Sequence, residues 1–321
     1  MGGPWEVDRA TFARRSNGRV ASGRGGGIAE QDHRGSGYRQ GSQAGRIVFE
    51  QAALSALQTR PRRDRFIRFA DDKDVVVIPC QFDEARWFSE SLAAVKRDDK
   101  WGYIDLCGDT KVPFFYDQAE HFKEGLGPVA TGKKWGFVNR SGRLVVPTTY
   151  DEVQGFSEGL AAVTENRQLK YIDRQGVVRI DNGYTQGTGF KEGLAGVQKD
   201  GKWGVIDRGG RVVIKYQYEE SYGATEGKIA VKRDGKWGFI DTNGRMVIDF
   251  RFEDLRCFAE GFAAVKLHGK WGFMDHTGKI AIVPQYDLVY DVSEGWALAW
   301  VIKEDSDGGF ISDETFIIEM P

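Results

Sequence analysis

The sequence predicts an all-β repeat protein built from about seven similar units of 34 residues. Three observations support this prediction: a Trp-Gly pair recurs in one register, a Glu-Gly pair recurs in the same register, and no insertion separates one unit from the next. Such strict spacing indicates that each unit stacks on its neighbour in a fixed geometry, because a change of length would displace every later contact.

The Trp-Gly pair marks five units of the series. Successive pairs lie 34 residues apart, with one gap in which Leu169-Lys170 occupies the expected position. The pairs are Trp101-Gly102, Trp135-Gly136, Trp203-Gly204, Trp237-Gly238 and Trp271-Gly272. We expect each Trp to be a core residue whose loss costs about 3 to 5 kcal/mol, and each Gly to leave room for a close neighbour.

A Glu recurs in the same register and is followed by Gly in every case except Glu90-Ser91. The seven positions are Glu90, Glu124, Glu158, Glu192, Glu226, Glu260 and Glu294. In a closed ring these side chains would form a circle of carboxylates able to bind cations or a basic peptide. Alternatively, each carboxylate accepts hydrogen bonds from nearby backbone N–H groups and holds its own turn. We favour the second interpretation, because every unit needs that turn.

One unit, residues 261–294, illustrates the expected elements. Its strands are predicted at 262–266, 270–275 and 279–283, which makes a three-stranded antiparallel meander. His268-Gly269 forms the first turn, and in the preceding unit Asp234-Gly235 supplies the positive φ angles that a two-residue hairpin favours. Residues 284–294 are expected to be a connection to the next unit.

Both faces of these strands are apolar. Trp271 and Phe273 are expected on one face and Met274 on the other. Strands that are covered on two sides lose the polar alternation of a half-exposed sheet. The pattern therefore predicts sheets stacked face to face, like the blades of a propeller.

The two ends of the series suggest how the units are arranged. Strands at 66–71 and 74–79 lack a first strand, and residues 296–301 could supply it. That pairing would close a propeller-like ring of seven blades, which we favour. The alternative is an open, curved β-solenoid, and residues 310–318 would be an extra edge strand.

Composition divides the chain into an arm, residues 1–59, and a β domain, residues 60–321. The arm is rich in Gly and Arg and is expected to be largely disordered, with a short helix at 48–58. Residues 1–65 hold twelve arginines against six acidic residues, whereas the remainder holds 33 basic against 41 acidic residues. Nucleic acid is therefore an unlikely partner except through the arm.

Signatures of catalysis and of metal binding are missing from the sequence. Cys80, Cys107 and Cys257 lie far apart without C-x-x-C spacing, which argues against a disulfide framework or a zinc site. The histidines accompany no nucleophile motif, and no stretch of about 18 apolar residues could cross a bilayer. We expect a cytoplasmic protein that is not an enzyme, holds no cofactor or metal and does not bind a membrane.

The string Gly235-Lys236-Trp237-Gly238-Phe239-Ile240-Asp241 resembles the WG (KWG) repeat family, which is common in bacterial proteins. The resemblance covers roughly residues 65–302, and residues 169–186 depart from the pattern. It implies a β-rich repeat scaffold, often the binding portion of a larger protein. The family brings no catalytic residues to carry over.

The function predicted from these features is a non-enzymatic scaffold that binds another protein. One alternative is a small-ligand binder or hydrolase-type enzyme that uses a central pocket of the ring, and another is nucleic-acid binding by the arm. Specificity should lie where the units differ, and Trp, Tyr and Arg make good anchors there. The candidate partner-binding residues are Trp87, Arg167, Tyr184, Tyr216, Tyr222, Trp296 and Trp300.

Overall fold

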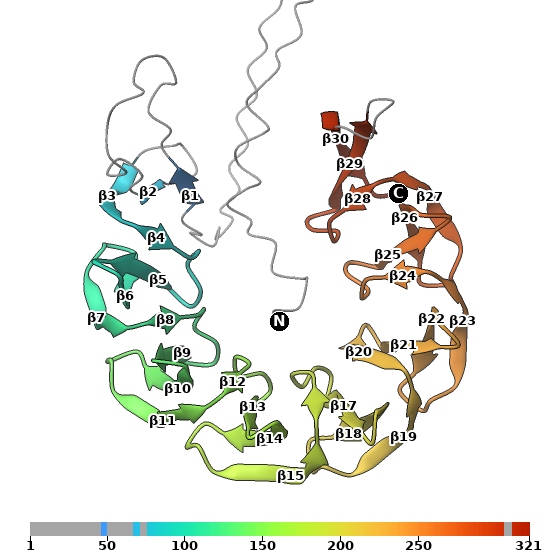
Figure 1. Cartoon of the computed structure of the whole chain (residues 1–321). Coiled ribbons are helices and arrows are strands. Elements are labelled where there is room, and N and C mark those ends of the chain that lie inside the picture. Colours follow the sequence, from blue (N-terminus) through green and yellow to red (C-terminus); the bar gives the residue numbers. More distant parts are fainter. Residues whose placement is uncertain (1–45, 50–66, 71–75, 305–309) are drawn as a thin grey trace, which may run out of the picture. The chain divides into compact units, whose positions relative to one another are not determined.

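A computed structural model describes residues 46–49, 67–70, 76–304 and 310–321. These residues form thirty strands, and no helix occurs among them. The strands group in chain order into eight antiparallel sheets (Figure 1). Among the described residues, therefore, no helix has the length and apolar character needed to cross a bilayer.

The sheets follow one another along the sequence. The first sheet holds β1 (Arg46–Phe49), β2 (Ile67–Ala70) and β3 (Val76–Phe82). The second holds β4 (Glu84–Ala85), β5 (Leu92–Arg97), β6 (Lys100–Asp105) and β7 (Thr110–Tyr116). The third holds β8 (Gln118–Ala119), β9 (Leu126–Thr131), β10 (Lys134–Asn139) and β11 (Leu144–Tyr150). The fourth holds β12 (Glu152–Val153), β13 (Leu160–Glu165), β14 (Gln168–Asp173) and β15 (Val178–Tyr184).

The remaining sheets continue this order. The fifth holds β16 (Gln186–Gly187), β17 (Leu194–Lys199), β18 (Lys202–Asp207) and β19 (Val212–Tyr218). The sixth holds β20 (Glu220–Thr225), β21 (Lys228–Arg233), β22 (Lys236–Asp241) and β23 (Met246–Phe252). The seventh holds β24 (Asp254–Leu255), β25 (Phe262–Leu267), β26 (Lys270–Asp275) and β27 (Ile280–Tyr286). The last sheet holds β28 (Leu288–Val289), β29 (Trp296–Glu304) and β30 (Phe310–Glu319).

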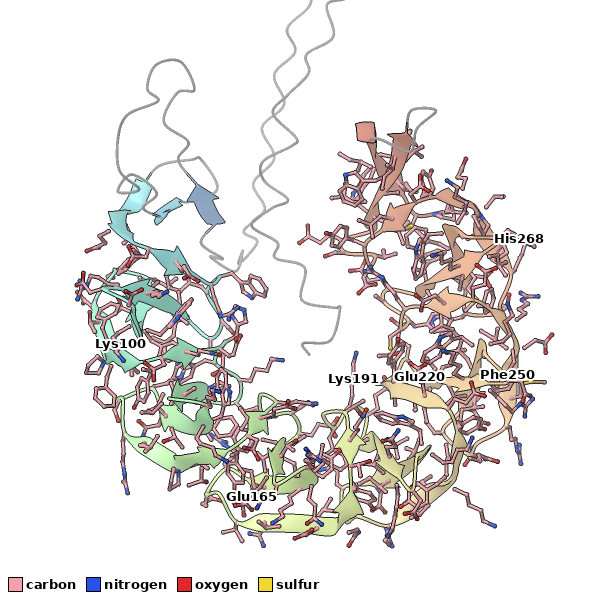
Figure 2. The ribbon with its side chains drawn as sticks, in the orientation of Figure 1. Lys100, Glu165, Lys191, Glu220, Phe250 and His268 are labelled. Carbon is pink, nitrogen blue, oxygen red and sulfur yellow. The ribbon has the colours of Figure 1, made fainter. Side chains whose placement is uncertain are left out.

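The repeated sheets have four strands, so the three-stranded prediction was wrong. The additional strand opens each of these sheets and has two residues everywhere except in the sixth sheet, where β20 has six. In the seventh sheet it is β24, which pairs with β25 through Asp254↔Lys266 and Leu255↔Val265. It lies at one edge of the sheet, and the long last strand lies at the other, as Glu220 and Phe250 illustrate for the sixth sheet in Figure 2. A strand of two residues is too short to produce a recognisable sequence pattern.

The chain divides into two compact units, which are described separately. One unit comprises the described residues up to Lys133 together with Phe137–Leu144, and the other comprises Lys134–Gly136 and Val145–Pro321. Within each unit, the buried side chains come from the faces of successive sheets.

Stacking of sheets on both faces is clearest in the second unit. Met274 and Val265 of the seventh sheet pack with Phe239 of the sixth sheet. From the same seventh sheet, Trp271 and Phe273 instead pack toward the last sheet, with Val289, Val292, Ala297 and Ala299. Both faces of the strands are therefore buried, as the sequence predicts.

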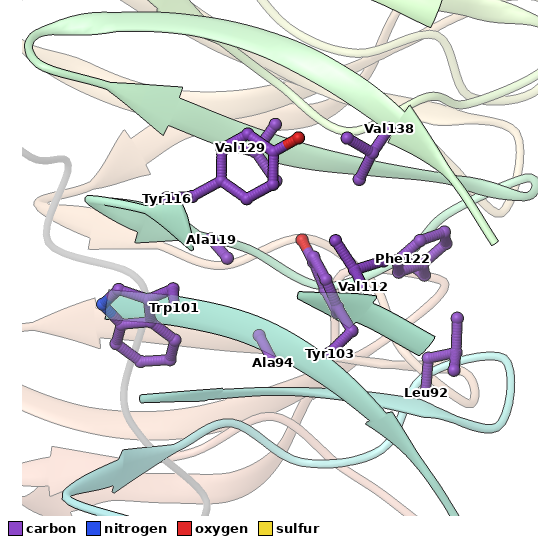
Figure 3. Packing of buried hydrophobic residues seen from close by; sticks show 10 residues of the cluster. All are labelled: Leu92, Ala94, Trp101, Tyr103, Val112, Tyr116, Ala119, Phe122, Val129 and Val138. Atoms are coloured by element: carbon purple, nitrogen blue, oxygen red, sulfur yellow. The ribbon is translucent and has the colours of Figure 1, made fainter. Parts of the chain in front are cut away.

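The same packing occurs in the first unit. Tyr103 and Trp101 of the second sheet contact Phe122 and Val129 of the next sheet (Figure 3). The rings of Tyr103 and Phe122 meet edge to face at 4.7 Å. The Tyr103 hydroxyl donates a hydrogen bond to the carbonyl oxygen of Glu120 at 2.6 Å, which satisfies its polar group in a buried position.

The Gly of the Trp-Gly pair is required by the neighbouring strand of its own sheet. In β18 the pairing with β19 shifts register between Trp203 and Val205, and Gly204 lies at the shift. A Cβ atom on Gly204 would lie 2.6 Å from the carbonyl oxygen of Ile214. The close neighbour expected from the sequence is thus the backbone of the adjacent strand in the same sheet.

The unit without a Trp-Gly pair has no glycine at this position of the strand. Lys170 occupies the Gly position, and its ammonium group lies 3.2 Å from Glu165 and 3.6 Å from Asp181. On the partner strand β15, Gly183 adopts a φ of 72°. In this sheet the glycine therefore lies on the adjacent strand β15 and not at the Trp-Gly position.

The turns within the sheets follow the predicted chemistry. In the hairpins at Asp234-Gly235 and His268-Gly269 both residues have positive φ, between 51° and 76°. This is the geometry of the two-residue turn predicted from the sequence.

Predictions about the two ends of the chain were less successful. Strand β29 pairs with β28 and β30, and β2 pairs with β1 and β3, so the strand exchange predicted to close a ring is wrong. Within the described residues, no sheet is shared by the two ends. The predicted strand at 310–318 is confirmed, since β30 is the edge strand of the last sheet.

The prediction for the arm is only partly addressed. Val48 and Phe49 belong to β1, so the helix expected from residue 48 does not begin there. The other residues of that expected helix, and residues 1–45, lie outside the described part of the chain.

Candidate functional site

The Glu residues of the repeated turns adopt a backbone conformation that is unusual for residues other than Gly. The φ angles of all seven lie between 50° and 56°. A Cβ atom costs free energy in this left-handed region, so the conformation persists only where other contacts hold it.

The Glu carboxylates supply such contacts to the next turn along the chain. Glu192 accepts hydrogen bonds from the backbone N–H groups of Glu226 and Gly227, at 2.6 and 2.9 Å. Glu260 accepts two bonds from the following turn in the same way, both at 2.8 Å. Further bonds run from Gly125 to Glu90, from Gly193 to Glu158 and from Gly261 to Glu226. Each of these carboxylates holds the following turn and not its own, which corrects the sequence-based interpretation.

Two of these carboxylates also contact a basic side chain from the following sheets. Arg140 donates a hydrogen bond to Glu90 at 3.1 Å, and His276 Nε2 lies 2.8 Å from Glu226. Burial by itself would raise the pKa of Glu90, but the bonds from the Gly125 N–H and from Arg140 lower it. Five of the seven carboxylates thus accept hydrogen bonds from the following turn. Within the described residues, no cluster of three or more His, Cys, Asp or Glu is arranged to hold a metal.

Glu294 differs from the earlier members of the series because no described turn follows it at the same interval. It has the same positive φ, 56°, and its side chain is exposed. The carboxylate that would hold a following turn therefore faces solvent beside the last sheet.

The last sheet covers the seventh sheet with only one of its faces. Ala297 and Ala299 of β29 are buried in the cluster that contains Trp271. Because side chains alternate along a strand, the side chains between and beyond them point to the opposite face. These are Trp296, Leu298, Trp300 and Ile302.

Strand β30 adds one apolar side chain to this opposite face, next to the charged Glu319, which pairs with Trp296. Ile317 pairs directly with Leu298, and opposed residues share a face of the sheet. We call the set Trp296, Leu298, Trp300, Ile302 and Ile317 the end face. Trp296 is 46% exposed, Ile302 42% and Ile317 67%, while Leu298 and Trp300 are half-buried.

Trp300 is oriented by an aromatic neighbour. Its ring meets that of Tyr290 edge to face at 5.0 Å. One unit earlier, Arg256 occupies the position of Tyr290 and lies over the Trp271 ring at 5.7 Å. Arg256 also lies over the ring of Tyr290, again at 5.7 Å.

The structure separates the seven predicted partner-binding residues. Trp296 and Trp300 lie together on the end face. Tyr184 is wrongly predicted as an anchor, because it is 1% exposed and belongs to the core of its sheet. Tyr216 packs against the same core, with its hydroxyl 3.4 Å from that of Tyr184.

The other candidates are scattered over different sheets. Trp87 stacks on His121 at 4.1 Å, and Tyr222 stacks on Trp237 at 4.6 Å. Arg167 is exposed in a hairpin turn with a φ of 65°. None of these three residues belongs to the last sheet.

Leu298, Ile302 and Ile317 were missed by the sequence analysis. The signal was the alternation of β29, Trp296-Ala297-Leu298-Ala299-Trp300, in which small and large side chains alternate. Small residues face the crowded side of a stacked sheet, so the large ones mark the side that lacks a neighbour.

A family model of the WG containing repeat matches the chain seven times in succession. The matched segments are 68–101, 101–135, 135–167, 171–203, 203–237, 237–271 and 271–305. The chain belongs to the WG repeat family. The resemblance inferred from the Trp-Gly strings is confirmed. The match is interrupted only at residues 168–170, where Leu169-Lys170 replaces Trp-Gly, and it resumes at residue 171.

No curated protein matches this WG repeat chain. Among solved structures, a eukaryotic initiation factor is similar, with a TM-score of 0.54 at 13% identity over 78% of this chain and 82% of that one. Dihydro-heme d1 dehydrogenase NirN in complex with DHE matches with a TM-score of 0.48 at 14% identity, over 86% of this chain and 78% of that one. Hsv2p of Kluyveromyces lactis gives 0.43 at 9% identity, over 75% of this chain and 99% of that one. At such identities the first similarity concerns the fold alone, which is propeller-like and all-β.

Proposed function

We propose that this WG repeat protein is a non-enzymatic scaffold that binds another protein, and that the end face is its contact surface. The observation that supports the proposal is the continuity of Trp296, Leu298, Trp300, Ile302 and Ile317 on one face of the last sheet. Scattered exposed apolar residues are ordinary, but a contiguous set on one face is typical of an interaction site.

The composition of the end face also favours a protein partner. Trp is among the side chains that most often carry binding energy in protein interfaces, and two Trp residues lie here on one strand. The strand and its neighbours are held by regular pairing, so little conformational entropy is lost when a partner binds.

The test is affinity purification from cell extract with the full chain, the Ile317→Asp variant and the Val283→Asp variant, followed by quantitative mass spectrometry. Val283 is a matched control, because it is 68% exposed against 67% for Ile317 and lies on β27 of the preceding sheet. A protein retained by the wild type and the Val283 variant, but lost with the Ile317 variant, supports the proposal.

The opposite results would contradict it. If the two aspartate variants retain the same proteins in the same amounts as the wild type, the end face is not the contact surface. If both variants lose the same protein equally, the effect is one of added charge and not of the end face.

A further inference from the structure

One turn position of the four-stranded sheets carries a side chain that reaches back to the preceding sheet in three cases, Arg140, Arg208 and His276. It lies between the last two strands, directly after the Asp or Asn that caps the turn. The residues at this position are Leu106, Arg140, Arg174, Arg208, Thr242 and His276. Arg140 and His276 each contact the Glu that lies 50 residues earlier, Glu90 and Glu226 respectively. Among the described residues, the side chain at this position thus has an acidic partner in two of the six four-stranded sheets.

Arg208 differs from Arg140 in this respect. The Glu that lies 50 residues earlier is Glu158, whose carboxylate accepts the Gly193 N–H at 2.9 Å. In the described part of the chain no ion pair joins Arg208 to it or to another acidic residue. The guanidinium lies beside the preceding turn, since a Cβ atom on Gly159 would be 3.7 Å from Arg208 Nη2.

A cavity of about 670 Å³ opens at this place. Its lining combines two glycines, one apolar side chain and four polar or charged side chains, and all of them belong to the second unit. They are Gly159, Leu160, Asp173, Gln175, Arg179, Arg208 and Gly209. The cavity is an open depression on the surface and not an enclosed pocket.

The second arginine of the cavity is fixed in place by Asp173. Arg179 donates its Nε–H to Asp173 Oδ2 at 2.7 Å, while Asp173 Oδ1 accepts the backbone N–H groups of Gln175 and Val177, both at 2.9 Å. Burial alone would raise the pKa of Asp173, but the bonds from the Val177 backbone and from Arg179 lower it, so the carboxylate is ionised. Two guanidinium groups and one carboxylate leave one positive charge in the lining.

Two arginines occur together at this position only between the fourth and fifth sheets. In the sequence, the residue equivalent to Arg179 lies 29 positions before the turn residue equivalent to Arg208, which gives one combination for each pair of successive sheets. The other combinations are Lys111 with Arg140, Val145 with Arg174, Val213 with Thr242 and Val247 with His276. Where Lys111 and Arg140 meet, both already have acidic partners, Asp105 at 2.8 Å and Glu90 at 3.1 Å. Only the cavity at Arg208 combines two arginines. Arg179 is paired with Asp173, whereas Arg208 has no acidic partner among the described residues.

We propose that this cavity binds an oxyanion, the phosphate or carboxylate group of a small ligand. The planar fork of Arg208 donates two parallel hydrogen bonds to two oxygens of such a group. The Arg179 edge turned away from Asp173 and the Gln175 amide can add further donors. The site is separate from the end face and does not depend on the protein-binding function.

The experiment is calorimetric titration of the full chain at low ionic strength with methyl phosphate in one arm and acetate in the other. We expect saturable binding of at least one probe, and the tighter of the two identifies the group that the cavity accepts. Arg208→Ala should weaken binding at least about tenfold, the loss expected for one charge-assisted, two-pronged pair. Arg208→Lys, which keeps the charge without the fork, should lie between the wild type and the alanine variant.

Arg245→Ala is the matched control, because Arg245 is an exposed arginine in the corresponding turn of the next sheet. It should leave the affinity within about twofold of the wild-type value. The melting temperature of Arg208→Ala should equal that of the wild type, since Arg208 holds no ion pair among the described residues. The proposal is overturned if neither probe saturates, or if Arg245→Ala weakens binding as much as Arg208→Ala.

Discussion

Leu194 and Trp296 occupy the same position in two sheets, yet one is core and the other is surface. Leu194 is 9% exposed and packs with Ala224, Ile229 and Val231 of the sheet that follows. Trp296 is 46% exposed, on the face of the last sheet that no described sheet covers. The repeat pattern decides to which face a side chain points, whereas the presence of a following sheet decides whether that side chain is buried.

The strongest test of this comparison removes a large side chain from each kind of face. Phe239 is fully buried between the sixth and seventh sheets. Phe239→Ala should lower the free energy of unfolding by about 3 to 5 kcal/mol, through lost apolar contact and the cavity left behind. Chemical denaturation followed by tryptophan fluorescence measures this loss.

Trp296→Ala is the counterpart on the end face. Because Trp296 already lies partly in solvent, its removal should cost less than about 1 kcal/mol in the same measurement. Equal losses for the two variants would mean that the end face is packed like an interior face, and the comparison would fail.

A smaller effect is expected where backbone geometry excludes a side chain. Gly204→Ala places a Cβ atom 2.6 Å from the Ile214 carbonyl oxygen, which forces two strands of one sheet apart. We expect a destabilisation of about 1 to 3 kcal/mol, read from the denaturation midpoint.

Gly189→Ala controls for the loss of glycine itself. A Cβ atom there would meet nothing closer than 3.8 Å, and Gly189 has no positive φ. This variant should lie within about 0.5 kcal/mol of the wild type. A large loss at Gly189 would show that contacts beyond steric exclusion determine where the repeat needs glycine.

The smallest effect concerns the last two carboxylates of the Glu series. The N–H groups of Gly295 and Glu294 hold the pKa of Glu260 below its ordinary value of 4.5. A lowered pKa means that this stabilisation is present above pH 4.5 and is lost as pH falls through the folded pKa. The melting temperature of Glu260→Gln should therefore lie below that of the wild type at pH 7, and the two should converge in acid.

Glu294→Gln should behave differently, because no described turn follows Glu294 to donate to its carboxylate. Its melting temperature at pH 7 should match that of the wild type. A pH-dependent difference as large as that of Glu260→Gln would contradict the assignment of these bonds to the following turn.

The sequence predicted those features that a side-chain pattern can encode. The Trp-Gly register gave the period, the apolar residues around Phe273 gave two buried faces, and Asp234-Gly235 gave the hairpin turn. The two-residue strands were missed, since Asp254 and Leu255 are defined by hydrogen bonds to β25 and not by any alternation of their own.

The candidate site was only half predictable for a related reason. Trp296 and Trp300 stood out by residue type, but Tyr184 did too, and it is buried. Ile317 belongs to the end face only because it pairs with Leu298. The number of residues between β29 and β30 does not determine this register. Whether a residue is covered depends on what stacks next to it, which a single unit does not encode.

The hydrogen bonds between successive Glu-Gly turns make the two ends of the second unit unequal. Each carboxylate serves the turn after it, from Glu192 to Glu226 and from Glu226 to Gly261. Removing sheets from the C-terminal side would leave behind a carboxylate that water can solvate at little cost. Removal from the N-terminal side would instead leave a turn in a left-handed conformation with its N–H donors unsupported. The two edges of any fragment are therefore unequal, and the integrity of each sheet depends on its predecessor more than on its successor.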